Sequence, residues 1–395
     1  MNAIEAVFWV AGSLVVYTYL VYPVLLVVFS GLKQLVADLR YLGSGSSRRA
    51  AQRERGPLPR VAVLVAAHNE ERHIVERLRN LLGCAYPPEL MRVYVGSDGS
   101  SDATNALVRA AAHERIVFRA FEARRGKPSV INDLAALADE DILVFTDANT
   151  AFEPDTVAKL VRHFDDPGIG CVCGELRLTA PPGSENPDNL YWRYERLLKF
   201  FEGRVGALLG ANGGVYALRR EHYRPIPADT IVDDFSISVD LIVRGLRCAY
   251  DPEARASEEI PARIEDEFRR RVRIGIGNYQ AWRRHAALMD PRRGAVAFSF
   301  ISHKCLRWLV PHALVLLLVA NAGLATQRPA YLAPFLAQLL FYAAAAVGYG
   351  LGRRGRVPRL LRVPVFFVSM NLALLVASYR YFSGQLSGTW ARTPR

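Results

Sequence analysis

The feature that most constrains this chain is an apolar run over residues 5–30, which carries a single charge, at Glu5. At a rise of about 1.5 Å per residue, a helix of this length exceeds the roughly 20 residues that cross a bilayer. No basic segment precedes the run and no small-residue cleavage site follows it, so the pattern predicts a transmembrane helix rather than a signal peptide. Basic residues follow over 33–55. The positive-inside rule therefore places this flank in the cytoplasm and Met1 on the outer side.

Three more apolar stretches lie near the C-terminus. Residues 309–326 and 330–351 predict a membrane hairpin, and the five arginines within 353–362 predict that the following loop is cytoplasmic. Residues 363–383 are apolar enough to span the membrane, but the aromatic and basic residues near their end also suit the membrane interface. The sequence therefore predicts a multi-pass membrane protein and leaves the position of its last helix open.

Composition excludes several classes of protein. A hydrophobic fraction of 51% is too high for a disordered chain. Five cysteines form no paired framework, and Cys171 and Cys173 are too close for a CxxC metal or redox site, so we expect small buried residues rather than disulfides. The net charge of +12 could suggest nucleic-acid binding, but most of the excess lies beside membrane segments. We therefore expect no nucleic-acid partner.

Residues 58–262 have the pattern of an α/β domain. Short apolar runs alternate with helical segments, which predicts a mostly parallel sheet with covering helices. The predicted strands are 61–67, 92–96, 116–120 and 142–146. The predicted helices are 70–82, 104–113, 127–138 and 154–164.

Polar clusters follow three of these strands, at residues 68–70 (HNE), 98–102 (DGSSD) and 147–149 (DAN). Ligands in such sheets bind at the carboxyl ends of strands. Carboxylates after the second strand could accept hydrogen bonds from a nucleobase or ribose, and Asp147 with Asn149 could face Mg²⁺ or Mn²⁺. Each cluster is also typical of a turn or a helix N-cap.

Three further groups could carry chemistry. Gly126-Lys127 could hold phosphates, or could be an ordinary basic loop. Asp233 and Asp234 are adjacent carboxylates in an apolar run, 229–239, that we expect to be a strand; one of them would then face a pocket and could act as a general base. The basic cluster 269–273 could contact lipid headgroups or clamp a pyrophosphate.

The order of these motifs between transmembrane helices resembles that of the membrane-embedded family 2 glycosyltransferases, relatives of the hyaluronan, chitin, cellulose and poly-N-acetylglucosamine synthases. The resemblance implies an α/β fold of the GT-A type, a Rossmann-like, mostly parallel sheet in the cytoplasm, with transmembrane and interfacial α-helices. It also implies a nucleotide-sugar donor, a UDP-sugar by preference, and Mg²⁺ or Mn²⁺ as cofactor. It predicts a hexosyl- or N-acetylhexosaminyltransferase of the inner membrane.

The resemblance also assigns roles to residues. Asp234 would be the catalytic base, with Asp233 beside it, and Asp147 with Asn149 would hold the metal. Donor binding would fall to Ala67, Glu70, Asp98, Lys127, Asp147, Arg271, Arg273, Trp390 and Arg392. The acceptor would meet Asn212, Gly213 and Ile274.

Two departures from the family pattern matter for this assignment. Asn149 replaces the second Asp of the DxD motif, which removes a charge from the metal site. In the QxxRW motif Arg270 replaces Gln and Ile274 replaces Trp, and Ile cannot stack on a sugar as an indole does. The motifs therefore predict sugar transfer more directly than processive polymer synthesis.

The expected organisation has six parts. They are 1–32, a transmembrane helix; 33–57, a basic linker; 58–262, the GT-A domain; 263–308, an Arg-rich interfacial segment; 309–351, a transmembrane hairpin; and 352–395, a basic loop, a last helix and a WxRT tail. The expected function is inverting transfer of a sugar to a glycan or lipid-linked acceptor in bacterial exopolysaccharide biosynthesis, among membrane lipids. The alternatives are transfer of a single sugar to a lipid carrier, and a non-catalytic membrane receptor that binds a nucleotide.

Overall fold

The computed structural model describes residues 2–44, 56–179, 190–259, 264–353 and 357–385. The chain divides into two compact units. The sheet unit comprises residues 27–260, and the helical unit comprises residues 1–26 and 261–387.

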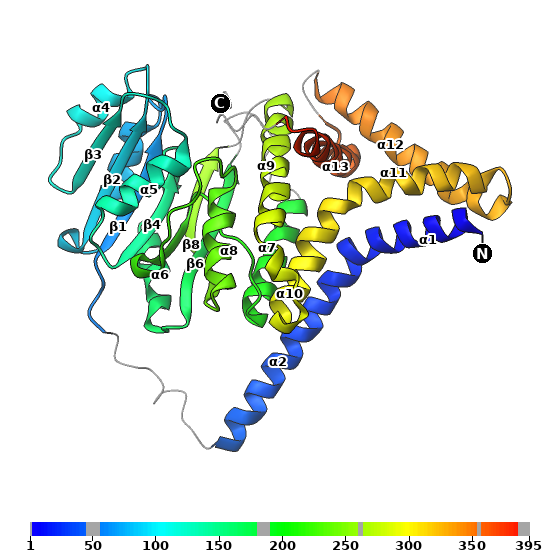
Figure 1. Ribbon diagram of the computed structural model, residues 1–395, viewed down its shortest axis with the longest axis horizontal. Helices are drawn as coiled ribbons and strands as arrows, with labels where there is room; N and C mark the ends of the chain where they lie inside the picture. Colours follow the sequence, from blue (N-terminus) through cyan, green and yellow to red (C-terminus); the bar gives the residue numbers. More distant parts are fainter. Residues whose placement is uncertain (1, 45–55, 180–189, 260–263, 354–356, 386–395) are drawn as a thin grey trace. The chain divides into compact units, whose positions relative to one another are not determined.

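An eight-stranded sheet lies at the centre of the sheet unit, in the order β3-β2-β1-β4-β7-β6-β8-β5 (Figure 1). Strands β3, β2, β1 and β4 are parallel, β7 is antiparallel to β4 and β6, β6 and β8 are parallel, and β5 is antiparallel to β8. The strands are β1 Val61–Ala67, β2 Met91–Asp98, β3 Ile116–Phe121, β4 Ile142–Asp147, β5 Thr150–Phe152, β6 Ile169–Thr179, β7 Tyr216–Arg219 and β8 Arg247–Glu259.

Helices cover this sheet, and their packing buries strands such as β1, which is why those strands are apolar. All seven residues of β1 are buried, as expected for a parallel strand with both faces covered. Gly96 on β2 lets Val130 and Leu134 of α5 approach the sheet closely. The helices are α3 Ile74–Leu82, α4 Thr104–Ala110, α5 Lys127–Leu137, α6 Thr156–Val161, α7 Leu190–Val205 and α8 Asp233–Val243. The predicted α/β class and GT-A-type architecture are confirmed, with antiparallel strands added to the parallel half.

One predicted strand is wrong. The apolar run 229–239 contains the start of a helix, α8, which begins at Asp233. An apolar run of this length fits a buried helix as well as a buried strand, and carboxylates are favoured in a helix's first turn by the helix dipole. Successive side chains on a helix are about 100° apart rather than opposite. Asp233 and Asp234 can therefore both face one pocket.

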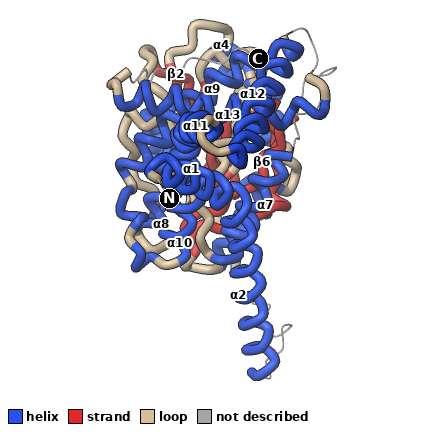
Figure 2. Tube along the Cα trace, turned by 90° about the vertical axis from the view of Figure 1, so that its right-hand side faces the viewer, coloured by secondary structure: helices blue, strands red, loops and turns tan. Residues whose placement is uncertain are grey.

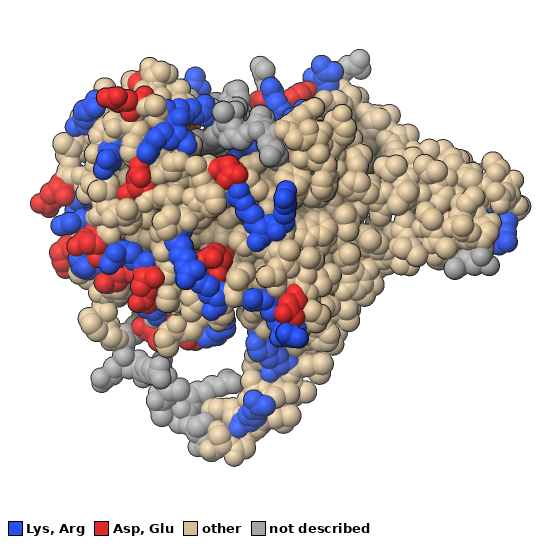
Figure 3. Space-filling view, in the orientation of Figure 1, with Lys and Arg blue, Asp and Glu red and all other residues tan. Residues whose placement is uncertain are grey.

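The helical unit contains the long apolar helices. Its members are α1 Ala3–Val16, a π-helical turn Tyr17–Val21, α9 Ile264–Arg284, α10 Ala295–Ser299, α11 Leu306–Ala325, α12 Leu332–Gly352 and α13 Arg359–Phe382. The turn leads into α2 Tyr22–Ser44, which begins in this unit and from Val27 onward belongs to the sheet unit. Four helical segments of the described residues are long and apolar enough to cross a membrane: Ala3–Ser44, Ala295–Ala325, Pro329–Gly352 and Arg359–Phe382. Helices α1, α11, α12 and α13 lie together in this unit (Figures 1 and 2). Charged side chains are sparse over them on the face shown in Figure 3.

Several helix boundaries differ from the expected ones, and two of the differences concern the apolar segments near the ends of the chain. Helix α2 continues to Ser44, so the first part of the expected linker 33–57 is helical. The expected stretch 363–383 corresponds to α13, which meets the length and hydropathy of a span. Its position along the membrane interface stays a prediction.

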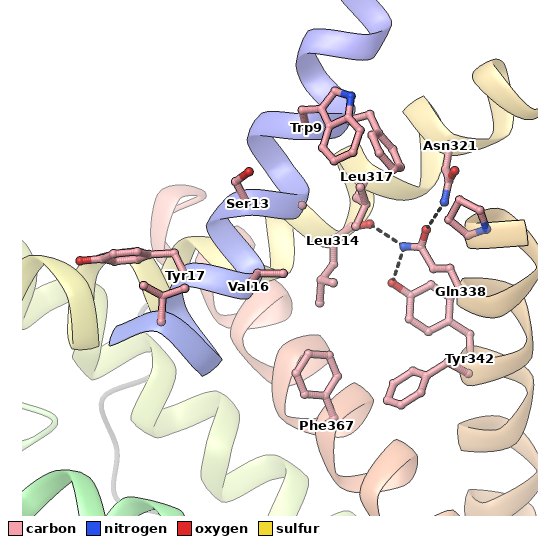
Figure 4. A pocket seen from close by; sticks show the side chains of 15 residues that line it. Trp9, Ser13, Val16, Tyr17, Leu314, Leu317, Asn321, Gln338, Tyr342 and Phe367 are labelled. Carbon is pink, nitrogen blue, oxygen red and sulfur yellow. Dashed lines mark hydrogen bonds between the residues drawn. The ribbon is translucent and has the colours of Figure 1, made fainter. Parts of the chain in front are cut away.

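A cavity among α1, α11, α12 and α13 is lined mostly by apolar side chains such as Trp9, Leu317 and Phe367 (Figure 4). Two hydrogen bonds cross one side of it. Asn321 Nδ2 donates to Gln338 Oε1 at 3.3 Å, and Gln338 Nε2 donates to the Tyr342 hydroxyl at 3.0 Å. Polar side chains of this kind join neighbouring helices in a bilayer, and the Asn321–Gln338 bond connects α11 with α12, whereas the Gln338–Tyr342 bond lies within α12.

Candidate active site

The carboxyl ends of β1, β2 and β4 form one edge of the parallel half of the sheet. Ala67, the last residue of β1, is paired with Ser97, one residue before β2 ends at Asp98. Ala66 is paired with Asp147, the last residue of β4. The polar clusters that follow these strands are therefore brought to one edge, where ligands bind in open α/β sheets.

The loop after β1 is hydrogen-bonded to the loop after β2. Asn69 has a left-handed backbone, with φ of 55°, and its Oδ1 accepts a hydrogen bond from Ser101 N at 2.8 Å. Glu70 N donates to Thr104 Oγ1 at 2.8 Å. These bonds fix the loop that follows Ala67 and contains Glu70. The roles of these two predicted donor-binding residues toward a nucleotide stay predictions.

Asp98 fixes a third loop to this edge. Its side chain is buried, and its carboxylate accepts hydrogen bonds from Arg125 N at 2.7 Å and Gly126 N at 2.8 Å. Gly99 permits this approach, because its φ is +61° and a Cβ there would lie 2.7 Å from Arg124 N. Asp98 therefore holds the loop that leads into α5 and delivers Lys127.

Lys127 joins two carboxylates from different elements. Its Nζ lies 2.9 Å from Asp147 Oδ1 at the end of β4 and 3.1 Å from Asp233 Oδ2 at the start of α8. Burial alone would lower the pKa of Lys127, but Asp147 and Asp233 raise it above its ordinary value. Lys127 therefore stays charged, and it connects the predicted metal ligand to the predicted catalytic pair.

Asp234 lies beside this network. Burial, with the charge of Asp233, raises the pKa of its carboxyl to about 6, against the opposing effects of Lys127, the Phe235 amide and Lys199. The Phe235 N–H donates to Asp234 Oδ1 at 2.8 Å. A largely enclosed carboxylate with a pKa near neutrality is suited to accept a proton during catalysis.

Asn149 has a carboxylate neighbour that the sequence did not reveal. Asn149 Nδ2 donates to Glu258 Oε1 at 3.4 Å, and Glu258 is 6% exposed. The two residues come together because β5 pairs with β8, with Thr150 opposite Glu258. No signal in the sequence links positions 109 residues apart.

This arrangement fits a divalent metal by the chemistry of its donors. Asp147, Asn149 and Glu258 offer carboxylate and amide oxygens, the ligands that Mg²⁺ and Mn²⁺ prefer. Within the described part of the chain, no group of three or more His, Cys, Asp or Glu side chains could hold a metal ion alone. A metal at Asp147 would therefore need oxygens beyond its protein carboxylates, such as those of a substrate phosphate.

The predicted acceptor loop passes beside Asp234. A Cβ on Gly213 would lie 3.2 Å from Asp234 Oδ2, so the absent side chain leaves space beside the carboxylate. The neighbouring residue Asn212 is held on two sides. Its Nδ2 donates to Gly174 O at 2.7 Å, and its Oδ1 accepts a hydrogen bond from Lys199 Nζ.

The sequence matches the family model described as glycosyltransferase-like family 2 over residues 59–277. This match covers more than half of the chain. The chain belongs to glycosyltransferase family 2. Membership of this family favours the predicted glycosyltransferase over the non-catalytic receptor.

Curated relatives of this chain are similar over a little more than half of its length. The poly-β-1,6-N-acetyl-D-glucosamine synthase of Staphylococcus aureus (strain COL) is 24% identical over 233 residues, which cover 56% of this chain and 55% of that protein. An N-acetylglucosaminyltransferase of Rhizobium leguminosarum bv. viciae is 26% identical over 247 residues, 58% of each chain. The chain thus matches little more than half the length of these curated relatives.

The fold is similar to that of a solved glycosyltransferase. The mannosyltransferase PcManGT from Pyrobaculum calidifontis, solved with GDP-mannose and Mn²⁺, superposes with a TM-score of 0.65 at 23% identity, over 92% of this chain and 98% of that one. At this identity the likeness supports the fold.

The remaining predicted site residues of this glycosyltransferase belong to the helical unit or lie outside the described residues. Arg271, Arg273 and Ile274 are on α9. Arg271 Nε lies 2.7 Å from Glu267 Oε1, and its guanidinium lies 4.8 Å from the centre of the Phe366 ring on α13. The structure therefore gives Arg271 contacts within its own unit, and its role toward a donor stays a prediction. Trp390 and Arg392 lie outside the described residues.

Proposed function

We propose that this enzyme transfers a sugar, with inversion at the anomeric carbon, from a nucleotide-sugar to a glycan or lipid-linked acceptor. The observation that carries this proposal is Asp234, a carboxylate whose pKa is raised to about 6 and which faces a loop that has no side chain at Gly213. Lys127 and Asp233 connect it to Asp147. A base, a cation and a candidate metal ligand therefore meet at one edge of the sheet.

Asp234 removes the proton from an acceptor hydroxyl as the oxygen attacks the anomeric carbon. The bond from that carbon to the diphosphate oxygen breaks, and its electron pair leaves with the nucleoside diphosphate. Lys127 stabilises charge on the diphosphate, and Asp233 holds Lys127 in place; Arg271 and Arg273 of α9 are further candidates for the same charge. When bound, a divalent metal supplies additional positive charge at the leaving group.

Mg²⁺ or Mn²⁺ is the cofactor that we assign to Asp147, Asn149 and Glu258. Asn149 stands where the DxD motif has its second carboxylate. Glu258 of β8 supplies a carboxylate beside Asn149. The solved mannosyltransferase of similar fold contains Mn²⁺, which supports this choice of ion.

Glu258→Gln should weaken Mn²⁺ binding by roughly 10–100-fold, the loss expected when a group that supports metal ligands is removed. Electron paramagnetic resonance of free Mn²⁺, titrated with purified protein, measures the affinity directly. Glu153→Gln is the matched control, because Glu153 is a partly exposed carboxylate that pairs with Arg177 and Arg255. Equal Mn²⁺ affinity in the two variants would remove Glu258 from the metal site.

N-acetylglucosamine is the sugar that we expect the donor to carry. Both relatives named above have names that specify this sugar, and a UDP-sugar is the donor implied by the family resemblance. The acceptor would be a growing glycan of an exopolysaccharide or a lipid carrier. The four candidate spans support placement in the inner membrane, with the sheet unit in the cytoplasm by the positive-inside rule.

A panel of labelled nucleotide-sugars, incubated with purified enzyme, Mn²⁺ and membrane lipids, tests this function. We expect transfer from UDP-N-acetylglucosamine above all other donors, and product length separates a polymerase from a single-sugar transferase. A chelator should stop the reaction. Transfer from no donor in the panel would contradict the proposal.

A further inference from the structure

A cation on α7 lies at the acceptor side of the site. Lys199 is partly buried, and its Nζ donates a hydrogen bond to Asn212 Oδ1. Its neighbour Leu198 is buried, so this face of α7 is turned into the unit. Nothing in the family motifs singles out Lys199.

The orientation of Asn212 is determined by its partners. Its Nδ2 must face the carbonyl of Gly174, at 2.7 Å, because a carbonyl accepts hydrogen bonds and cannot donate them. Its oxygen therefore faces the ammonium of Lys199. The backbone N–H of Asn212 also donates to Cys173 Sγ at 3.2 Å. Asn212 is thus hydrogen-bonded twice to β6 and once to α7.

The next residue of the loop reaches the base. Gly213 packs against Asp234, where an added Cβ would lie 3.2 Å from Oδ2. A shift of Asn212 would therefore move the chain that borders the carboxylate. Lys199 binds the amide oxygen of Asn212, while Gly174 binds the amide nitrogen. Loss of the Lys199 side chain would therefore leave the Asn212 side chain held only through its nitrogen.

Lys199 and Lys127 have different kinds of partner for their ammonium groups. Lys127 is shared between Asp147 and Asp233. Among the residues that the structure describes, the direct partner of Lys199 is a neutral amide. The charged and titratable groups that influence or face Asp234 are Asp233 on its own helix, Lys127 of α5, Lys199 of α7, Cys173 of β6 and Tyr216 of β7.

We propose that Lys199 is a positioning residue for sugar transfer: through Asn212 it holds the acceptor loop against Asp234. The inference rests on the proposed function, since it assigns Asp234 as the base. An ammonium has three N–H donors, and the bond to Asn212 uses one of them. The others are available to acceptor hydroxyls.

The test compares Lys199→Met with Lys199→Arg in the full-length enzyme. Lys199→Met should lower kcat/KM for the acceptor by roughly 10–100-fold, the usual cost of losing a hydrogen bond to a charged group, while affinity for the donor stays within about twofold. Lys199→Arg, which keeps the charge and a donor, should recover most of this loss. Lys159→Met is the control, because Lys159 of α6 pairs with the half-exposed Asp155.

The pH profile separates positioning from a merely structural role. A nearby cation lowers the pKa of Asp234, so its removal should raise that pKa and move the acid limb of the rate profile to higher pH. Lys199→Arg should return the limb to its original place. A loss of activity in Lys199→Met with an unmoved acid limb, or no loss at all, would overturn the proposal.

A double-mutant cycle tests the route through Asn212. If Lys199 acts through that amide, Lys199→Met should cost much less in an Asn212→Ala background than in the wild type. Fully additive losses would contradict the route. Failure of the wild-type enzyme to transfer any sugar would instead count against the proposed function and is distinguishable from both outcomes.

Discussion

Asp234→Asn should lower turnover by roughly 10²–10⁴-fold, the range associated with general acid–base catalysis, while affinity for the nucleotide-sugar stays within a few fold. The amide keeps the size of the side chain and can still accept the Phe235 N–H at its oxygen. It cannot take a proton from the acceptor hydroxyl. Steady-state transfer rates and equilibrium binding of the donor measure the two effects separately.

Asp240→Asn is the matched control for this change. Asp240 lies on the same helix, α8, and pairs with Arg244 at 2.9 Å, so its loss tests a carboxylate outside the network. The wild-type rate should also fall as the pH drops through about 6, because burial and Asp233 raise the pKa of Asp234 to that value and only the ionised form is a base. A wild-type rate in Asp234→Asn would refute its assignment as the base.

Lys127→Met should lower kcat/KM by roughly 10²–10³-fold, as expected when a group that stabilises transition-state charge is removed. The variant should also be less stable by about 3 kcal/mol, because Asp147 and Asp233 lose the cation between them. The side chain of Lys127 is 16% exposed, so solvent can compensate for only part of this loss. Sugar-transfer kinetics and thermal unfolding measure the two quantities.

A second substitution separates these two effects. Lys127→Met combined with Asp233→Asn removes one of the unpaired carboxylates, so it should recover part of the stability but little of the activity. Arg125→Gln is the control, because Arg125 is a neighbouring exposed cation that pairs with Asp133. Full activity in the stabilised double variant would mean that Lys127 supports the fold and not the reaction.

The parallel half of the sheet could be predicted because β1, β2 and β4 are largely buried and carry their signal in consecutive apolar residues. The first predicted strand, 61–67, has the bounds of β1, Val61–Ala67. Asp98 and Asp147 could be placed at strand ends for the same reason. Helix α8 could not be separated from a strand, since an apolar run around Asp233 and Asp234 fits both periodicities.

The contacts of the site were beyond prediction because they join distant parts of the chain. Lys127 could be expected to bind phosphate from its place in a basic loop, but its partners Asp147 and Asp233 come from two other elements. Glu258 reaches Asn149 through the pairing of β5 with β8, an edge of the sheet that the strand candidates did not include. Sequence patterns therefore predicted candidate reacting groups, and tertiary contacts determine how the charges of these groups are balanced.

The configuration of the transferred sugar tests the central claim most directly. A single base, Asp234, that activates the acceptor for direct displacement requires inversion, so an α-linked nucleotide-sugar must give a β-linked product. Nuclear magnetic resonance of the anomeric proton in the first product formed by the Mn²⁺-loaded enzyme reports this configuration. We predict a β linkage that Asp234→Asn does not produce; an α linkage from the same donor would contradict the account.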